Sequence, residues 1–376
     1  LLQGGLSLLA PYWISLLLAV GFMLLAQRPL NSVAATSRSA ISARDGRDYS
    51  RWGVVASALV FIILTGFRYG VGQDYFYTYV PYFYRVRSGL GFQEMEIGYY
   101  ALNYLVARFT DNPLPVFLVC SVAFFALTYA AIMRESSHPV FSVFLLFGMS
   151  YLFIYMNAMR QMLAVSILLF SLRYIEERDP VKFAACVAIA STFHSSSLVF
   201  IAAYYFPRLK ITPCICLVLV SGFLLLKVPI ASFVNTIIAK TQYAGYIGSI
   251  FDTGESGNVV IALNVVVLLF SAIVPKLYGG AYSERYRILL WCQLVATSIA
   301  ILSGLIPLSQ RLRWVFSLPS VILLPLAIDS ISNIKLKFLI QLVIVVLYIV
   351  YIAITIGMWN GNNVVPYHSI LMKGSL

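Results

Sequence analysis

The sequence predicts an all-α fold, that of a polytopic integral membrane protein with about 12 transmembrane helices. Of its 376 residues, 61% are hydrophobic and only 11% are charged, and the mean hydropathy is +0.88. Soluble domains contain about 45–50% apolar residues. Long apolar runs follow one another with few long polar gaps, so one membrane domain over residues 1–376 is the better prediction than two soluble domains.

The predicted helices are apolar runs that approach the roughly 20 residues needed to cross the hydrocarbon, and neighbouring helices can shield the ends of shorter ones. The first run is too long for the core of a signal peptide and follows no basic residue, so we expect it to be a retained helix. Two short runs, 181–194 and 195–206, form either two spans or one re-entrant hairpin. The runs cover residues 6–26, 52–67, 114–133, 140–157, 160–174, 181–194, 195–206, 213–228, 258–275, 287–306, 313–328 and 338–356.

The basic residues predict which side of the membrane each loop faces. The segment from Arg28 to Arg51 holds five arginines, which places it in the cytoplasm by the positive-inside rule. Carried along the chain, this orientation puts sixteen of the 26 basic residues on the cytoplasmic side and ten on the other. The net charge of +12 therefore reflects topology, and it does not indicate binding of nucleic acid.

Two long segments are expected on the extracytoplasmic side, residues 68–112 and residues 229–257. The first holds nine tyrosines, and aromatic side chains favour the membrane interface and stack on sugar rings. Within it, residues 96–109 carry apolar side chains at helical spacing, which predicts an amphipathic helix on the outer surface. The second segment is a candidate cover for a cavity.

Polar residues gather in four short islands between the apolar runs. With this orientation the islands lie at the extracytoplasmic ends of helices, and ionisable groups at membrane depth usually mark a function. If the islands open on the same side, they form one site. The residues concerned are Arg68 and Asp74, Arg160 and Gln161, His194 and Ser195, and Arg311.

Three arginines in these islands, Arg68, Arg160 and Arg311, fit one or two pyrophosphate groups. A guanidinium donates paired hydrogen bonds in one plane and stays charged at any biological pH. Each arginine also has a structural alternative. Arg68 can reach water from a helix end, Arg160 can join helices by hydrogen bonds, and either Arg311 or Arg313 can simply mark the interface.

Two side chains are candidates for a catalytic base. A neutral His194 could take a proton from a sugar hydroxyl, and a cationic His194 could hold a phosphate oxygen. The alternative is a hydrogen-bonded packing histidine. Asp74 follows the glycine pair Gly70 and Gly72, which favours a tight and specific loop, but its carboxylate could instead cap the next segment.

No cofactor is predicted. The sequence has no histidine cluster, paired-carboxylate motif or aspartate-rich motif for a metal, so we expect a metal-independent reaction. Glu94 and Glu96, for example, face opposite ways if the chain there is extended. The chain also lacks a Walker loop and a dinucleotide fingerprint. All five cysteines lie in apolar runs, and we interpret them as buried packing residues.

These motifs resemble the EpsG-type branch of the Wzy-like polysaccharide polymerases of bacterial exopolysaccharide and O-antigen assembly. Their order and spacing match from about residue 50 to residue 210, and past that point the match rests on Arg311 and on Val365-Pro366-Tyr367. The matching motifs are Arg68 with Gly72-Gln73-Asp74-Tyr75, then Asn157-Ala158-Met159-Arg160-Gln161, Arg173-Tyr174-Ile175-Glu176-Glu177, Phe183 and Phe193-His194-Ser195-Ser196.

The resemblance implies a glycosyltransferase with a membrane fold similar to the glycosyltransferase-C type. It would transfer a growing glycan from undecaprenyl pyrophosphate to the non-reducing end of another lipid-linked repeat unit, on the periplasmic face of the bacterial inner membrane. The partners would be the lipid-linked donor and acceptor and membrane lipids, with a chain-length regulator protein as a further candidate.

The resemblance also assigns roles to residues of this sequence. Arg68, Arg160 and Arg311 would bind pyrophosphate and stabilise the charge that develops as it leaves. His194 or Asp74 would activate the acceptor hydroxyl, with His194 preferred. The substrate-binding residues would be Tyr69, Tyr75, Gln161 and Ser195.

Three other functions compete with this one. An O-antigen ligase shares the donor but uses the lipid A core as acceptor, and the outer segments here are short for a ligase. A flippase or other transporter would bind the same pyrophosphate without catalysis, and such proteins usually contain a structural repeat. A membrane O-acyltransferase would use His194, but its donor enters from the cytoplasm, whereas the polar islands face outward.

Overall fold

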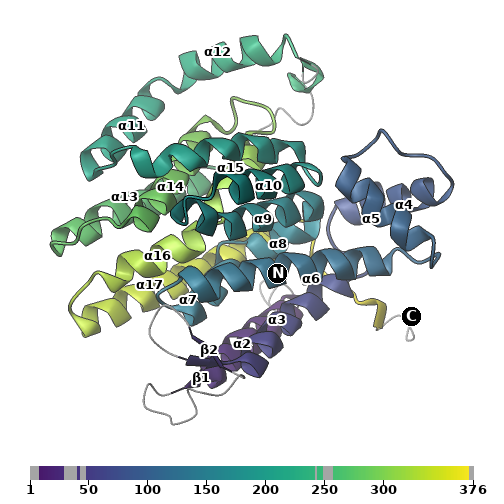
Figure 1. Cartoon of the computed structure of the whole chain (residues 1–376), viewed down its shortest axis with the longest axis horizontal. Coiled ribbons are helices and arrows are strands. Elements are labelled where there is room, and N and C mark those ends of the chain that lie inside the picture. Colours follow the sequence, from purple (N-terminus) through teal and green to yellow (C-terminus); the bar gives the residue numbers. More distant parts are fainter. Residues whose placement is uncertain (1–7, 29–39, 43–47, 242–243, 249–256, 372–376) are drawn as a thin grey trace. The chain divides into compact units, whose positions relative to one another are not determined.

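The computed structural model describes residues 8–28, 40–42, 48–241, 244–248 and 257–371. Its architecture is helical, as the sequence predicts (Figure 1). Within the described ranges the strands form one small antiparallel sheet, in the order β1-β3-β2. The central strand β3 (Asp48–Ser50) pairs with β1 (Gln27–Arg28) and with β2 (Ala40–Ser42).

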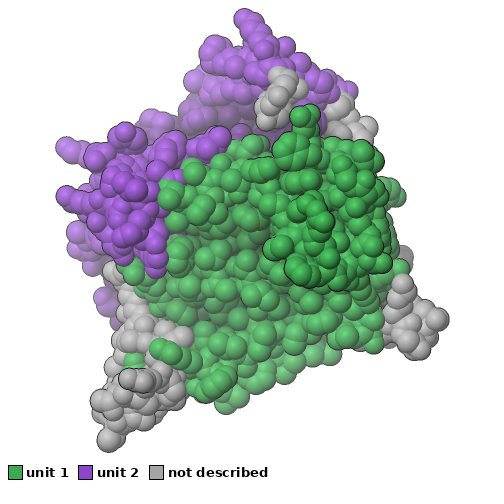
Figure 2. Space-filling view, turned by 45° about the vertical axis from the view of Figure 1, so that its right-hand side comes forward, with its two compact units in different colours: residues 1–170, 185–195, 338–376 green, residues 171–184, 196–337 purple. Residues whose placement is uncertain are grey.

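The chain divides into two compact units, coloured separately in Figure 2. It passes between them four times, so neither unit is one continuous stretch of sequence. The prediction of a single membrane domain stays a prediction, since two groups of contacts in an interleaved chain do not by themselves make two domains. Unit 1 comprises Leu1–Phe170, Ala185–Ser195 and Phe338–Leu376, and unit 2 comprises Ser171–Ala184 and Ser196–Lys337.

Unit 1 contains most of the predicted site. Four helices have residues in both units, namely α9 (Met159–Glu176), α10 (Pro180–Ser191), the 3₁₀-helix η3 (Ser195–Arg208) and α17 (Ile334–Ile352). The helices wholly in unit 1 are α2 (Ala10–Ala26), α3 (Arg51–Gly66), the π-helix η2 (Tyr75–Tyr79), α4 (Val80–Arg87), α5 (Ile97–Ala107), α6 (Leu114–Glu135), α7 (Pro139–Gly148), α8 (Tyr151–Asn157) and the π-helix η5 (Ala353–Met358).

Small residues let α3 approach α2 closely. A Cβ atom on Gly53 would lie 2.5 Å from the Cβ of Ala26, and the Ser57 hydroxyl donates a hydrogen bond of 2.7 Å to the carbonyl of Ala19. Interfaces between membrane helices are typically built from such residues, because they allow tight packing and satisfy polar groups without water. The first half of α3 is therefore packed closely against α2.

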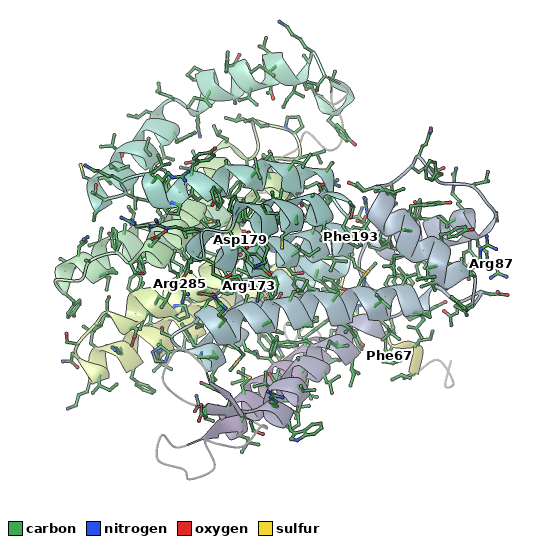
Figure 3. The ribbon with its side chains drawn as sticks, viewed as in Figure 1. Phe67, Arg87, Arg173, Asp179, Phe193 and Arg285 are labelled. Atoms are coloured by element: carbon green, nitrogen blue, oxygen red, sulfur yellow. The ribbon has the colours of Figure 1, made fainter. Side chains whose placement is uncertain are left out.

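In unit 2, ion pairs connect the end of α9 to the start of α14 (Glu284–Leu302). The Arg285 guanidinium donates to the Glu176 carboxylate, with Nη2 and Oε2 2.6 Å apart, and Arg178 pairs with Glu284 at 3.6 Å. Arg285 is labelled in Figure 3. The helices wholly in unit 2 are α11 (Pro213–Leu225), α12 (Lys227–Ile238), the 3₁₀-helix η4 (Ala244–Tyr246), α13 (Asn258–Leu277), α14 (Glu284–Leu302), α15 (Ser309–Ser317) and α16 (Ser320–Asp329).

Several of the helices are suited to crossing a membrane. Among the described residues, α6, α13, α14 and α17 with η5 are long and apolar enough to span it alone. Counting each bent helix pair as one span gives up to seven; α7 and α8 are bent by 51°, α11 and α12 by 74°, and α15 and α16 by 45°. These helices indicate a polytopic membrane protein, and the larger number of spans stays a prediction.

Most of the predicted apolar runs coincide with helices, and the helix predicted at residues 96–109 is α5. Its position on the outer surface of the membrane stays a prediction. The run at 140–157 is not one straight helix, because Ser150 has a φ of 70° and separates α7 from α8. The run at 195–206 lies in the 3₁₀-helix η3. Residues 6 and 7 of the first run, and 242–243 and 249–256 of the second outer segment, lie outside the described residues.

The prediction that every cysteine is buried is wrong for Cys214, whose side chain is exposed, and Cys186 is half-buried. Cys214 belongs to α11, which also leaves Leu217 and Val218 exposed. An apolar run predicts a helix that avoids water, but it does not tell which face packs against protein and which face suits lipid.

Candidate functional site

Arg68 follows the last turn of α3 and is fully buried, with 0% of its surface exposed. Its Nη1 donates to the Thr65 carbonyl at 2.5 Å and its Nη2 to the Met156 carbonyl at 3.1 Å. The guanidinium carbon also lies 4.9 Å from the centre of the Phe117 ring. Arg68 therefore joins the end of α3 to the end of α8, and the alternative of an arginine that reaches water is wrong.

The glycine loop after Arg68 packs on the junction between α8 and α9. Gly72 has a φ of +91°, and a Cβ atom there would lie 2.7 Å from the Met156 carbonyl oxygen. Two residues later, the Asp74 amide donates to the Asn157 side-chain oxygen at 3.2 Å. The Asp74 side chain makes no capping hydrogen bond to η2, so the capping alternative is wrong.

The segment near the carboxyl end of the chain supports the same loop from another side. The amides of Tyr69 and Gly72 donate to the carbonyls of His368 and Asn363, both at 2.9 Å, and the Ile370 amide donates to a carbonyl at the end of α3, also at 2.9 Å. That carbonyl belongs to Phe67, which is labelled in Figure 3. The matching motif Val365-Pro366-Tyr367 lies within this segment.

Arg160 lies in the first turn of α9 and forms an ion pair with Glu96, the residue that precedes α5. The two side chains remain partly accessible, at 18% for Arg160 and 21% for Glu96. The other Glu96 oxygen accepts the Ser195 amide at 3.1 Å. Glu96 thus joins the Arg160 island to the island that contains His194, and α5 is also fixed by a 2.7 Å hydrogen bond from Gly98 to the Thr192 carbonyl.

Tyr79 lies between the loop that follows Arg68 and the ion pair of Arg160. Its hydroxyl donates to the Asn157 carbonyl at 2.7 Å, and its ring centre is 6.1 Å from that of Tyr99, over which Arg160 also lies. Burial raises the pKa of Tyr79, the Asp74 carboxylate raises it further, and Arg160 lowers it. The Asp74 and Arg160 islands are therefore near neighbours in unit 1.

The remaining predicted site residues differ in how accessible they are. His194 is buried at 9% exposure and Gln161 at 3%, whereas Ser195 is exposed. Tyr75 is buried and stacks on Phe117 with ring centres 4.8 Å apart. The tyrosines of residues 68–112 that present an exposed side chain are Tyr77, Tyr84 and Tyr104.

Arg311 lies near the start of α15 in unit 2 and is partly exposed. The cluster in unit 1 forms without it, so its role in the site stays a prediction. Within the described ranges, no group of three or more histidine, cysteine, aspartate or glutamate side chains could hold a metal ion. The prediction of a metal-independent reaction is not tested by that observation.

Glu96 was not singled out from the sequence as a site residue, and of the segment Asn363–Ser369 only the motif Val365-Pro366-Tyr367 was noted. For Glu96 a signal existed, because four of the 14 acidic residues fall in residues 68–112. Two of the four, Glu94 and Asp111, pair with surface arginines of the same segment. The carboxyl-terminal segment contributes the carbonyls of Asn363 and His368, and backbone carbonyls leave no mark on side-chain patterns. Its Tyr367 and Ser369 hydroxyls donate to the carbonyls of Leu64 and Phe67, at 2.9 and 3.0 Å.

The fold and this group of side chains are those of a helical membrane protein with a candidate anion-binding site. The chain belongs to the EpsG family, whose model matches residues 52–369. This match confirms the family resemblance found in the motifs, and it suggests a glycosyltransferase-like function of the polysaccharide-polymerase type. No curated protein and no solved structure matches the chain.

Proposed function

We propose that this protein is a polymerase that joins undecaprenyl-pyrophosphate-linked oligosaccharide repeat units on the extracytoplasmic face of the bacterial inner membrane. The observation that carries the proposal is the grouping in unit 1 of three islands that are far apart in sequence. Asn157 and Glu96 connect the islands of Arg68, Arg160 and His194 through the contacts described above. Membership of the EpsG family supports the same conclusion.

In this proposal the arginines act in different ways. Arg160 is partly exposed and binds the pyrophosphate of the donor directly. Arg68 is buried beneath the loop, where it keeps the α8–α9 junction in place and adds positive potential. Preorganised cations in a dry site stabilise the charge that develops on a leaving group. Arg311 is retained from the family resemblance as a further candidate pyrophosphate ligand.

The transfer breaks the bond between the anomeric carbon of the donor glycan and its pyrophosphate oxygen. A new bond forms between that carbon and a hydroxyl oxygen of the acceptor, and the hydroxyl proton passes to a base. We assign this base to His194, with Asp74 as the second candidate. Gln161, Ser195 and the tyrosines of residues 68–112, including Tyr69 and Tyr75, are the proposed sugar-binding residues.

The test is an assay with the purified full-length protein in lipid and a synthetic undecaprenyl-pyrophosphate repeat unit. A polymerase produces a ladder of products that increase by one repeat unit at a time. Transfer of one glycan to lipid A core, without a ladder, would identify a ligase. Movement of the substrate across the membrane without new bonds would identify a transporter, and either result would overturn the proposal.

A further inference from the structure

We propose that the Glu96 carboxylate occupies Arg160 when no donor is bound and is displaced by pyrophosphate when the donor arrives. Glu96 is then a positioning residue that sets the affinity of the site and the release of its product. This inference rests on the proposed function, because it takes the pyrophosphate of a lipid-linked glycan as the incoming anion.

Glu96 already meets the requirements of an anion ligand for Arg160. A carboxylate and a phosphate present similar oxygen pairs to a guanidinium, so one can replace the other in the same geometry. The pair is also less exposed than the pair of Arg85 and Glu94 in the same segment, at 18% and 21% against 56% and 39%. The ion pair between Arg160 and Glu96 is therefore partly shielded from water.

Arg160 would be left without a counter-ion in the absence of both Glu96 and the donor. A cation shielded from water is destabilising unless an anion accompanies it. Exchange of the Glu96 carboxylate for pyrophosphate keeps Arg160 paired before and after the donor binds. The Glu96 carboxylate thus keeps Arg160 charged and in place before the donor binds. It also lowers the affinity of Arg160 for the incoming pyrophosphate.

The displaced Glu96 carboxylate stays near Arg160. Its second oxygen accepts the Ser195 amide at 3.1 Å, and the Gly98 amide holds the start of α5 against the Thr192 carbonyl. Although Glu96 precedes α5 directly, its side chain does not cap that helix. The carboxylate can therefore leave Arg160 without unfolding a helix end, and it can return when the product departs.

Glu96→Gln tests the exchange, because the amide keeps a hydrogen-bond acceptor for Ser195 but loses the negative charge. Isothermal titration calorimetry of the full-length protein in lipid nanodiscs, with inorganic pyrophosphate as the probe, measures the affinity directly. We expect binding roughly threefold to tenfold tighter than in the wild type, the range that a weak to moderate ion pair represents.

Two variants control this measurement. Glu94→Gln removes the same charge two residues away, from a carboxylate that pairs with exposed Arg85, and we expect wild-type affinity. Glu96→Asp keeps the charge and should also bind pyrophosphate within about twofold of the wild type. An unchanged or weaker affinity of Glu96→Gln for pyrophosphate overturns the inference. An equal gain in affinity in either control variant also overturns it.

The polymerisation assay gives a second and independent readout. We expect Glu96→Gln to lower the KM for the lipid-linked donor and to lower kcat, because tighter binding of pyrophosphate also slows release of the lipid product. If Glu96→Gln forms a ladder with an unchanged KM for the donor, the role of Glu96 is overturned but the proposed function is not. Absence of a ladder from the wild type overturns the proposed function, whereas the calorimetry, which uses no glycan, still decides whether Glu96 competes for Arg160.

Discussion

At the scale of single residues, the environment separates two arginines that look alike in the sequence. Arg68 directs its donors at the Thr65 and Met156 carbonyls and has no exposed surface. Arg160 keeps part of its surface accessible and pairs with a carboxylate that an anion can replace. The sequence identified both as candidates, but it could not reveal that one is enclosed, because the enclosing groups come from distant parts of the chain.

Gly72 allows a direct test of the loop that carries Asp74. Gly72→Ala would place a Cβ 2.7 Å from the Met156 carbonyl at a φ of +91°, and both the strain and the overlap should destabilise the loop. We expect a loss of roughly 1–3 kcal/mol in the free energy of unfolding and a strongly reduced rate of polymerisation. Thermal unfolding in detergent and the product ladder are the measurements.

Gly89 provides the matched control for Gly72. It also has a positive φ, +80°, but no atom lies within 4 Å of the position that a Cβ would take there. Gly89→Ala should therefore show only the conformational cost of about 1 kcal/mol and form the full ladder. Equal losses of activity in the two variants would show that backbone strain alone, and not contact with the α8–α9 junction, explains the result.

At the scale of elements, the sequence predicted where helices lie better than where they break. The run 140–157 is continuous in hydrophobicity, yet α7 and α8 meet at a bend of 51°. The hydrophobic pattern of the sequence does not distinguish Ser150, at this break, from other serines in apolar helices. By contrast, α5 was predictable, because its apolar residues recur at helical spacing over a segment otherwise rich in polar residues.

The carboxyl-terminal segment is an element whose role can be tested by deletion. Removing residues 363–376 takes away the carbonyls of Asn363 and His368, which accept the amides of Gly72 and Tyr69. We expect faster hydrogen exchange at these two amides and a slower polymerisation reaction. The amides within α6 are the internal control, and unchanged exchange at Tyr69 and Gly72 would contradict a supporting role for the segment.

At the scale of the whole molecule, composition and charge were sufficient to predict a helical membrane protein. They were not sufficient to predict its division into two units, because the chain returns to unit 1 at Ala185 and again at Phe338. Such returns depend on which helix faces meet, and helices that are apolar all round carry little information about that. For the same reason Arg311 could be named as a candidate but not placed beside Arg160.

The predicted topology can be tested with single cysteines in a variant that lacks the five native ones. Gln73→Cys and Arg134→Cys suit this purpose, because both native side chains are exposed. The positive-inside rule places Gln73 outside and Arg134 in the cytoplasm. We expect a membrane-impermeant thiol reagent added to intact cells to label position 73 only. Labelling of position 134 alone would reverse the orientation and remove the site from the periplasmic face.

The measurement that tests the central claim most directly is the initial rate of ladder formation by Arg160→Ala, beside Arg85→Ala. Both variants remove an arginine from an ion pair with a glutamate of residues 68–112, but only Arg160 is assigned to the pyrophosphate. We expect Arg160→Ala to lose about 10²- to 10³-fold in rate and Arg85→Ala to match the wild type. A near-normal ladder from Arg160→Ala would contradict the account.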